Sequence, residues 1–145
     1  GNPLTGKELY YMKKFDNYIS NLAVLCKAGE EDLSNEFIIS GIIDKFFVQF
    51  ELGWKVLKEL LRYEGVEASA VGSPRVIIKE AYKVFSFVDE AVWLSMLRAR
   101  NDMTHIYDGQ AAGRLVQVIL KEYIPAFAKL KKDIMEYYGG NIPEV

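Results

Sequence analysis

Hydrophobic side chains recur every three or four residues along most of the chain, and no stretch alternates convincingly between polar and apolar residues. A spacing of three and four places apolar side chains on one face of an α-helix, whereas alternation is typical of strands. The pattern predicts about five helices, over residues 5–28, 32–63, 74–85, 89–105 and 110–138. Because the connections between them are short, we predict an all-α fold, an antiparallel up-and-down helical bundle.

Residues that favour helix ends mark several of these boundaries. Thr5 is a candidate N-cap for the first helix, and Gly29 is a candidate C-terminal stop. Ser73 is expected to cap the third helix, with Pro74 at its first position. Proline is favoured there because a backbone N–H at that position has no partner within the helix. Pro125 lies inside the last helix, removes one backbone hydrogen bond and is expected to kink that helix.

The second predicted helix is unusually long and has a broad apolar face. It starts near Asp32 or Ser34, reaches Tyr63 and ends at Gly65. A helix of about 30 residues is roughly 45 Å long. Its main apolar stripe consists of Ile39, Ile43, Phe46, Phe50, Trp54, Leu57 and Leu61. The width of this face suggests burial on two sides, and a second subunit is one candidate for covering it.

The composition fits one soluble globular domain that comprises residues 1–145. Of the 145 residues, 50% are hydrophobic and 26% are charged, and the net charge is -2. A chain of this length can bury a sufficient core without a disulfide or a metal. The single cysteine, Cys26, excludes a disulfide within the chain, and no secretory leader is evident, so a cytoplasmic location is expected. The most apolar stretch, Phe37 to Trp54, carries charged residues and is not expected to span a membrane.

Common metal and nucleotide motifs are absent from the sequence. With one histidine, one cysteine and no H-E-x-x-H, we predict no metal site and no cofactor. Neither of the glycine-rich loops that cradle phosphates is present. The nearly balanced charge gives no general nucleic-acid footprint, so any contact with RNA depends on the local placement of basic residues.

One stretch, Arg98 to Asp108, concentrates polar functional groups and holds the only histidine. On an ideal helix Asn101 and His105 share a face, while Arg100 points about 140° away from His105. Arg100 and His105 can therefore meet only if the helix ends between them or if a partner subunit closes the site. The alternative is that both side chains only cap the C-terminal end of a helix, where cations are favoured.

The segment Arg100 to Tyr107, R-N-D-M-T-H-I-Y, resembles the R-x4-H-x-Y signature of the HEPN superfamily. Within that superfamily the chain resembles the nucleotidyltransferase substrate-binding family, most clearly over residues 38–130. The further matching segments are Phe50-Glu51-Leu52-Gly53-Trp54-Lys55-Val56-Leu57, Ser73-Pro74-Arg75, Glu80-Ala81 and Trp93. R-x4-H alone would be a weak signal, but the order and context of these segments make it specific.

The resemblance implies a homodimeric helical bundle that works beside a separately encoded minimal nucleotidyltransferase. In the HepT-like branch, it implies the toxin half of a toxin-antitoxin pair, a metal-independent ribonuclease that is silenced when the partner attaches AMP to the signature tyrosine. Carried over residue by residue, Arg100 and His105 would be catalytic, Asn101 would be an adjoining polar member, and Tyr107 would be the site of adenylylation.

This chemistry is physically reasonable for these residue types. His105 can act as a base for the 2′-OH of RNA or as an acid for the leaving oxygen, and Arg100 can bind the phosphate. One chain offers one histidine, so a two-fold dimer with both signatures at its interface would supply the second. Two alternatives remain open at this stage: a non-catalytic subunit that presents RNA or a nucleotide to the nucleotidyltransferase, and a plain interaction module.

The other residues of the resemblance have structural explanations. Trp54 and Trp93 fall on apolar stripes and are predicted to be core aromatics. Lys55 follows Glu51 by four residues and precedes Glu59 by four, a spacing typical of ion pairs on a helix surface.

Overall fold

The computed structural model describes the backbone of residues 6–67 and 72–143, and the side chains of residues 14–67 and 72–143. The elements are α1 (Gly6–Leu25), the 3-10 turn η1 (Ala28–Glu30), α2 (Glu36–Tyr63), α3 (Pro74–Val84), α4 (Glu90–Asn101), α5 (Thr104–Tyr107), α6 (Gly109–Val118), the π-helical turn η3 (Ile119–Tyr123) and α7 (Ile124–Tyr137). Within these ranges no strand is present, and the prediction of an all-α fold is confirmed. None of the described helices is long and apolar enough to cross a membrane.

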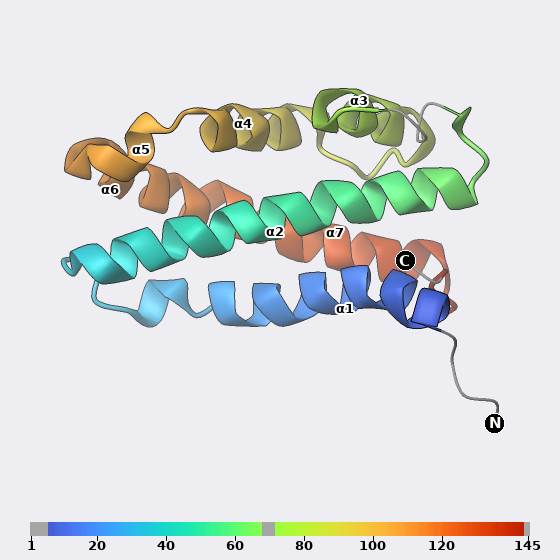
Figure 1. Cartoon of the computed structure of the whole chain (residues 1–145), viewed down its shortest axis with the longest axis horizontal. Coiled ribbons are helices and arrows are strands. Elements are labelled where there is room, and N and C mark those ends of the chain that lie inside the picture. The colour runs from blue at the N-terminus through green and yellow to red at the C-terminus, as the bar shows by residue number, and fades with distance from the viewer. Residues whose placement is uncertain (1–5, 68–71, 144–145) are drawn as a thin grey trace.

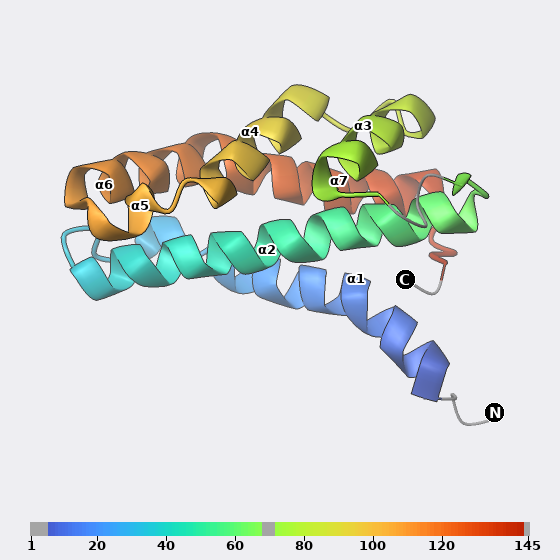
Figure 2. The ribbon, with the colours of Figure 1, turned by 45° about the horizontal axis from the view of Figure 1, so that its top comes forward.

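The long segments lie side by side and alternate in direction. Figure 1 shows α1 and α2 running in opposite directions, α3 and α4 running back above them, and α6 to α7 returning along the same length. In the turned view of Figure 2, α1 lies below α2 and the α6–α7 segment lies above it. Contacts from α1, α3, α4 and α6 reach α2. Helices of the same chain therefore cover α2 on more than one side, which explains its broad apolar face.

The buried side chains of these helices form one hydrophobic core. Trp93 on α4 is buried as predicted, with 1% of its surface exposed, and packs against the rings of Phe50 on α2 and Phe127 on α7. Trp54 is only partly buried and packs against the edge of the core. The core thus joins α4 to both α2 and α7.

The predicted C-terminal end of the first helix was wrong. α1 ends at Leu25, and Gly29 lies inside η1, where it does not adopt the left-handed conformation of a glycine stop. The 3-10 turn places Ala28 in the hydrophobic core. Gly65 does have a positive φ of 80° and follows α2 as predicted. The predicted N-cap Thr5 lies outside the described residues.

Asn35, rather than Asp32 or Ser34, caps α2. Its side-chain oxygen accepts the backbone N–H of Phe37 at 2.8 Å. Asp32 cannot cap the helix because its carboxylate accepts both the backbone N–H and the hydroxyl of Ser34, at 3.0 and 2.6 Å. The predicted start of α3 is confirmed: Ser73 accepts the N–H of Val76, and proline occupies the first turn.

The disturbance expected at Pro125 takes the form of a π-helical turn. In η3 the N–H of Ile124 donates to the carbonyl of Ile119, five residues back rather than four. The wider turn comes directly before Pro125, which has no N–H to donate. The helical path from α6 through η3 to α7 otherwise follows the predicted last helix closely.

Candidate functional site

The fourth predicted helix does not reach His105, because α4 ends at Asn101 and the chain turns at Asp102. The backbone of Asp102 is extended, and its N–H still donates to the carbonyls of Arg98 and Ala99. Its carboxylate oxygen Oδ1 accepts the backbone N–H of Thr104 at 3.1 Å and the Thr104 hydroxyl at 2.7 Å. This turn starts the short helix α5, so a helix end separates Arg100 from His105. That end is one of the two conditions under which the two side chains could meet.

Arg100 lies at the last turn of α4 and is tied to α2. Its Nε donates to Oε1 of Glu51 at 2.8 Å, and its Nη2 forms an ion pair with the same oxygen. The other carboxylate oxygen of Glu51 accepts the indole N–H of Trp54 at 3.0 Å, while the ammonium of Lys55 lies 4.0 Å away. Glu51 therefore fixes the guanidinium from a separate helix.

Glu51 is a site residue that the sequence did not reveal. The spacing to Lys55 indicated a surface ion pair, which is present, but not the contact with Arg100, 49 residues further along the chain. The available signal was the clustering of Glu51 and Trp54 in one segment of the family resemblance. Local spacing carries no information on a contact between two helices so far apart in sequence.

Asn101 contacts Arg100 rather than His105. Its side-chain oxygen accepts an N–H of Arg100 Nη1 at 3.1 Å. The expectation that Asn101 and His105 share a helix face is wrong, because α4 ends at Asn101 and His105 belongs to α5. Among the described residues, the Asn101 side chain has no further hydrogen bond, so its amide N–H groups face no protein acceptor.

His105 lies beside Asp102 and does not contact Arg100. Its Nε2 lies 3.5 Å from Oδ2 of Asp102, and 21% of its side chain is exposed. Its Nδ1 is buried and has no hydrogen-bond partner. No hydrogen bond or ion pair of the described residues joins His105 to Arg100. In the single chain, therefore, Arg100 is paired with Glu51, while His105 lies next to a different carboxylate, that of Asp102.

Tyr107 ends α5 with its side chain 85% exposed. Met103 and Ile106 are also exposed, and with Tyr107 they form what we name the α5 surface. The next residue, Asp108, caps α6 by accepting the N–H of Gln110 at 2.9 Å. Figure 1 shows α5 at the end of the molecule opposite to both termini. The signature thus gathers at one end of the helices, with its tyrosine open to solvent.

We expect replacement of Glu51 by glutamine to lower the free energy of unfolding by about 1 kcal/mol, because Arg100 loses a charge-assisted hydrogen bond in a half-buried position. Urea unfolding followed by circular dichroism measures this change. The control is Glu80→Gln, which breaks the ion pair with Lys83 on the surface of α3 and should cost less than about 0.5 kcal/mol. Equal effects of the two substitutions would contradict a special role of Glu51.

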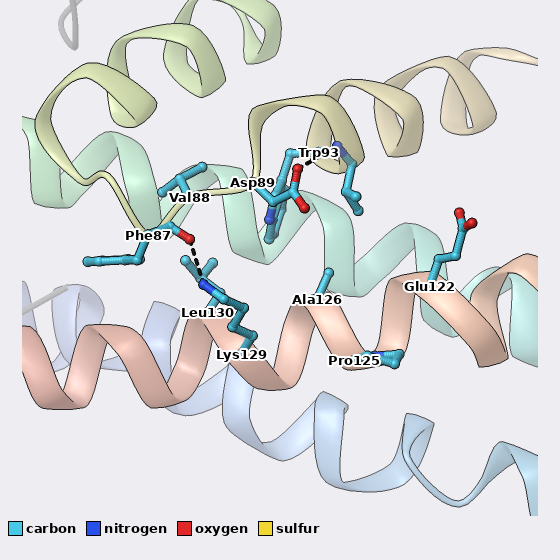
Figure 3. Close-up of a pocket in the computed structure, with 10 residues that line it drawn as sticks. Phe87, Val88, Asp89, Trp93, Glu122, Pro125, Ala126, Lys129 and Leu130 are labelled. Carbon is cyan, nitrogen blue, oxygen red and sulfur yellow. Dashed lines mark hydrogen bonds between the residues drawn. The ribbon is translucent and has the colours of Figure 1, made fainter.

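A separate hollow of about 350 Å³ lies between the start of α4 and α7. Figure 3 shows Trp93, Ala126 and Leu130 beside it, with Asp89 and Glu122 at its edges. Lys129 closes one side by donating to the carbonyl of Phe87 at 2.8 Å. No signature residue lines this hollow. In the part of the chain that the structure describes, no group of three His, Cys, Asp or Glu side chains could hold a metal ion.

Comparison with known proteins places the chain in a family. One similar protein is from Haemophilus influenzae and is named probable ribonuclease HepT, with 26% identity over 85 residues. The match covers 57% of this chain and 58% of that protein, so the chain spans little more than half the length of this relative. Residues 12–136 match the family model described as nucleotidyltransferase substrate binding protein like. The chain therefore belongs to this family, as the resemblance of its signature predicted.

Proposed function

We propose that the protein is a metal-independent ribonuclease of the HepT type, the toxin half of a toxin-antitoxin pair that acts in the cytoplasm. The observation that carries the proposal is the end of α4 between Arg100 and His105, which sets both side chains and the exposed Tyr107 around one turn of the chain. The name of the similar Haemophilus protein supports the ribonuclease activity, and the family description supports a nucleotidyltransferase partner.

Arg100 supplies positive charge for an RNA phosphate. A guanidinium has five N–H groups, and the contacts with Glu51 and Asn101 use three of those of Arg100. Two N–H groups are left to donate to phosphate oxygens while Glu51 keeps the guanidinium in place. The amide N–H groups of Asn101, whose oxygen accepts from Arg100 Nη1, have no protein acceptor among the described residues. Such preorganised donors stabilise the charge that develops as the 2′-oxygen attacks phosphorus.

His105 supplies the proton transfer in this proposal. The 2′-oxygen loses its proton and bonds to phosphorus, the bond from phosphorus to the 5′-oxygen breaks, and the leaving oxygen gains a proton. An imidazole can perform either transfer near neutral pH. Because both transfers are needed and each chain has one histidine, we propose a homodimer in which two signatures share one cleft. The apolar side chains of the α5 surface are suited to such an interface.

Tyr107 is the proposed site of control by the partner. Its hydroxyl would attack the α-phosphorus of ATP held by the nucleotidyltransferase, releasing pyrophosphate and leaving AMP on the phenol oxygen. The reaction needs an accessible side chain, and Tyr107 is largely exposed. AMP attached two residues from His105 would exclude RNA by its bulk and its negative charge.

We expect Tyr107→Phe to abolish AMP attachment when the protein is produced with its nucleotidyltransferase and ATP, because phenylalanine has no hydroxyl. Intact mass and peptide mapping measure the product. Tyr82→Phe, which changes another exposed tyrosine, is the control and should be modified as fully as the wild type. If the Tyr107→Phe variant still carried AMP, attached to another residue, the assignment of Tyr107 as the modification site would be contradicted.

The family description also supports a second candidate, a non-catalytic subunit that presents RNA or a nucleotide to the nucleotidyltransferase. The same mass measurement separates the two. A chain that stays unmodified but co-purifies with the transferase, and that is harmless when expressed alone, favours the binding subunit.

A further inference from the structure

Asp102 blocks one side of the proposed catalytic histidine. One carboxylate oxygen, Oδ1, is fixed by two hydrogen bonds from Thr104. The other oxygen, Oδ2, faces Nε2 of His105 at 3.5 Å. The hydrogen bonds from the hydroxyl and the backbone N–H of Thr104 hold the pKa of the Asp102 carboxyl below its usual value. The group that faces the imidazole is therefore a carboxylate at neutral pH, held in place by its own turn.

Only Nε2 of His105 can reach RNA, because the other ring nitrogen, Nδ1, is buried. Its Nδ1 is buried without a hydrogen-bond partner, so a proton there would be an unsatisfied buried donor. A proton on Nε2 instead faces the Asp102 carboxylate. With a carboxylate 3.5 Å from Nε2 and no acceptor at Nδ1, the surroundings favour the ring with its proton on Nε2. In that state Nε2 cannot accept the proton of a 2′-OH, and an RNA phosphate near it meets a fixed negative charge.

We propose that Asp102 is an autoinhibitory contact, whose carboxylate occupies the reactive side of His105 in the free chain and must move away before an RNA phosphate can reach Nε2. This inference rests on the proposed ribonuclease function and adds a resting state to the same site. Rotation of the Asp102 side chain breaks its two hydrogen bonds with Thr104 but leaves the core in place, because Asp102 is exposed to solvent.

The chain contains a matched control for this turn. Asp32 accepts the backbone N–H and hydroxyl of Ser34 in the same way that Asp102 accepts those of Thr104. The residue that follows Ser34 is Asn35, whereas the residue that follows Thr104 is His105. Asp32→Asn therefore removes the same charge from the same kind of turn, without a histidine facing it.

The first experiment measures binding of an oligonucleotide of 2′-deoxynucleotides, which cannot be cleaved through a 2′-OH. We expect Asp102→Asn to lower its Kd about fivefold relative to the wild type, since the repulsive charge is removed, and Asp32→Asn to change it less than about twofold. Thr104→Val keeps the charge but frees the carboxylate from one hydrogen bond, and should give an intermediate Kd. An unchanged or higher Kd for Asp102→Asn would overturn the proposal.

The second experiment measures cleavage of RNA by the wild-type chain and the same variants. Asp102→Asn should lower KM for RNA about fivefold without lowering kcat, whereas a residue that supports catalysis would show its loss in kcat. A fall in kcat for Asp102→Asn would therefore contradict autoinhibition. If neither the wild type nor any variant cleaves RNA, the proposed ribonuclease activity is rejected. The binding experiment then still tests whether Asp102 keeps nucleic acid away from His105.

Nuclear magnetic resonance of the only imidazole gives a third, independent measurement. The ¹⁵N spectrum of the neutral ring should place the proton of the free wild-type chain on Nε2, and Asp102→Asn should raise the fraction on Nδ1, since an asparagine amide can donate to Nε2. A proton on Nδ1 in the wild type would contradict the arrangement on which the proposal depends.

Discussion

Replacement of His105 by alanine is expected to reduce RNA cleavage by about 10²- to 10⁴-fold, the contribution typical of a positioned acid or base. The effect should be near the upper end, because the chain has one histidine and a dimer would lose both imidazoles at once. Initial rates on a fluorescently labelled RNA measure the change. The toxicity that we propose for the protein expressed without its partner should disappear in parallel.

The loss of activity in His105→Ala should not result from unfolding of the protein. His105 lies on the short helix α5, outside the hydrophobic core, and its Nε2 lies 3.5 Å from the Asp102 carboxylate. We expect the unfolding midpoint of His105→Ala to stay within about 2 °C of the wild type. His105→Asn is a second variant that keeps a polar group beside Asp102 but cannot transfer a proton near neutral pH, and it should be equally inactive. Cleavage that persists in both variants would contradict the catalytic role of His105.

The sequence predicted the helices well because burial imposes a regular spacing on apolar residues. The capped and proline-started α3 and the glycine after α2 follow from local chemistry and were predicted in place. The end of α4 at Asp102 was missed because the apolar spacing continues past it, while the turn depends on one carboxylate that accepts two bonds from Thr104. A turn of the same kind, in which Asp32 accepts two bonds from Ser34, precedes the Asn35 cap, so α2 starts at Glu36.

The candidate site was predicted only in part, for a related reason. The signature identified Arg100, Asn101, His105 and Tyr107 as one group; in the structure the first two end α4, the last two lie on α5, and His105 does not contact Arg100. Which carboxylate holds each cation could not be predicted, because Glu51 comes from another helix and Asp102 faces His105 only after α4 has ended. The roles of these residues remain predictions that the proposed experiments test.

Gly53 explains why one short segment of α2 can hold α4 so closely. A Cβ atom added to Gly53 would overlap the ring of Trp93, with Cζ3 at 2.8 Å, and would lie 3.1 Å from the ring of Tyr18. Phe50, one turn earlier, packs against the same indole ring. Glu51 lies between these two contacts and reaches Arg100 on α4. The missing side chain at Gly53 therefore sets the separation of α2 and α4 that the Glu51–Arg100 contact requires.

We expect Gly53→Ala to lower the free energy of unfolding by about 1–2 kcal/mol, the result of about 1–3 kcal/mol of overpacking and a helix-propensity gain of up to about 1 kcal/mol. The neighbours have little room to adjust. Trp93 is wedged between Phe50 and Phe127, and Tyr18 is anchored by a 2.7 Å hydrogen bond to the Phe127 carbonyl.

Gly41 on the same helix provides the opposite case. A Cβ there meets nothing within 4 Å, and the residue is exposed, so Gly41→Ala should raise the free energy of unfolding by about 0.5–1 kcal/mol. Urea unfolding of both variants measures whether the free energy of unfolding falls for Gly53→Ala and rises for Gly41→Ala. Because Gly53 also sets the distance between Glu51 and Arg100, Gly53→Ala should reduce RNA cleavage as well, whereas Gly41→Ala should not. Equal stabilisation by both substitutions would contradict a close approach of α4 at Gly53.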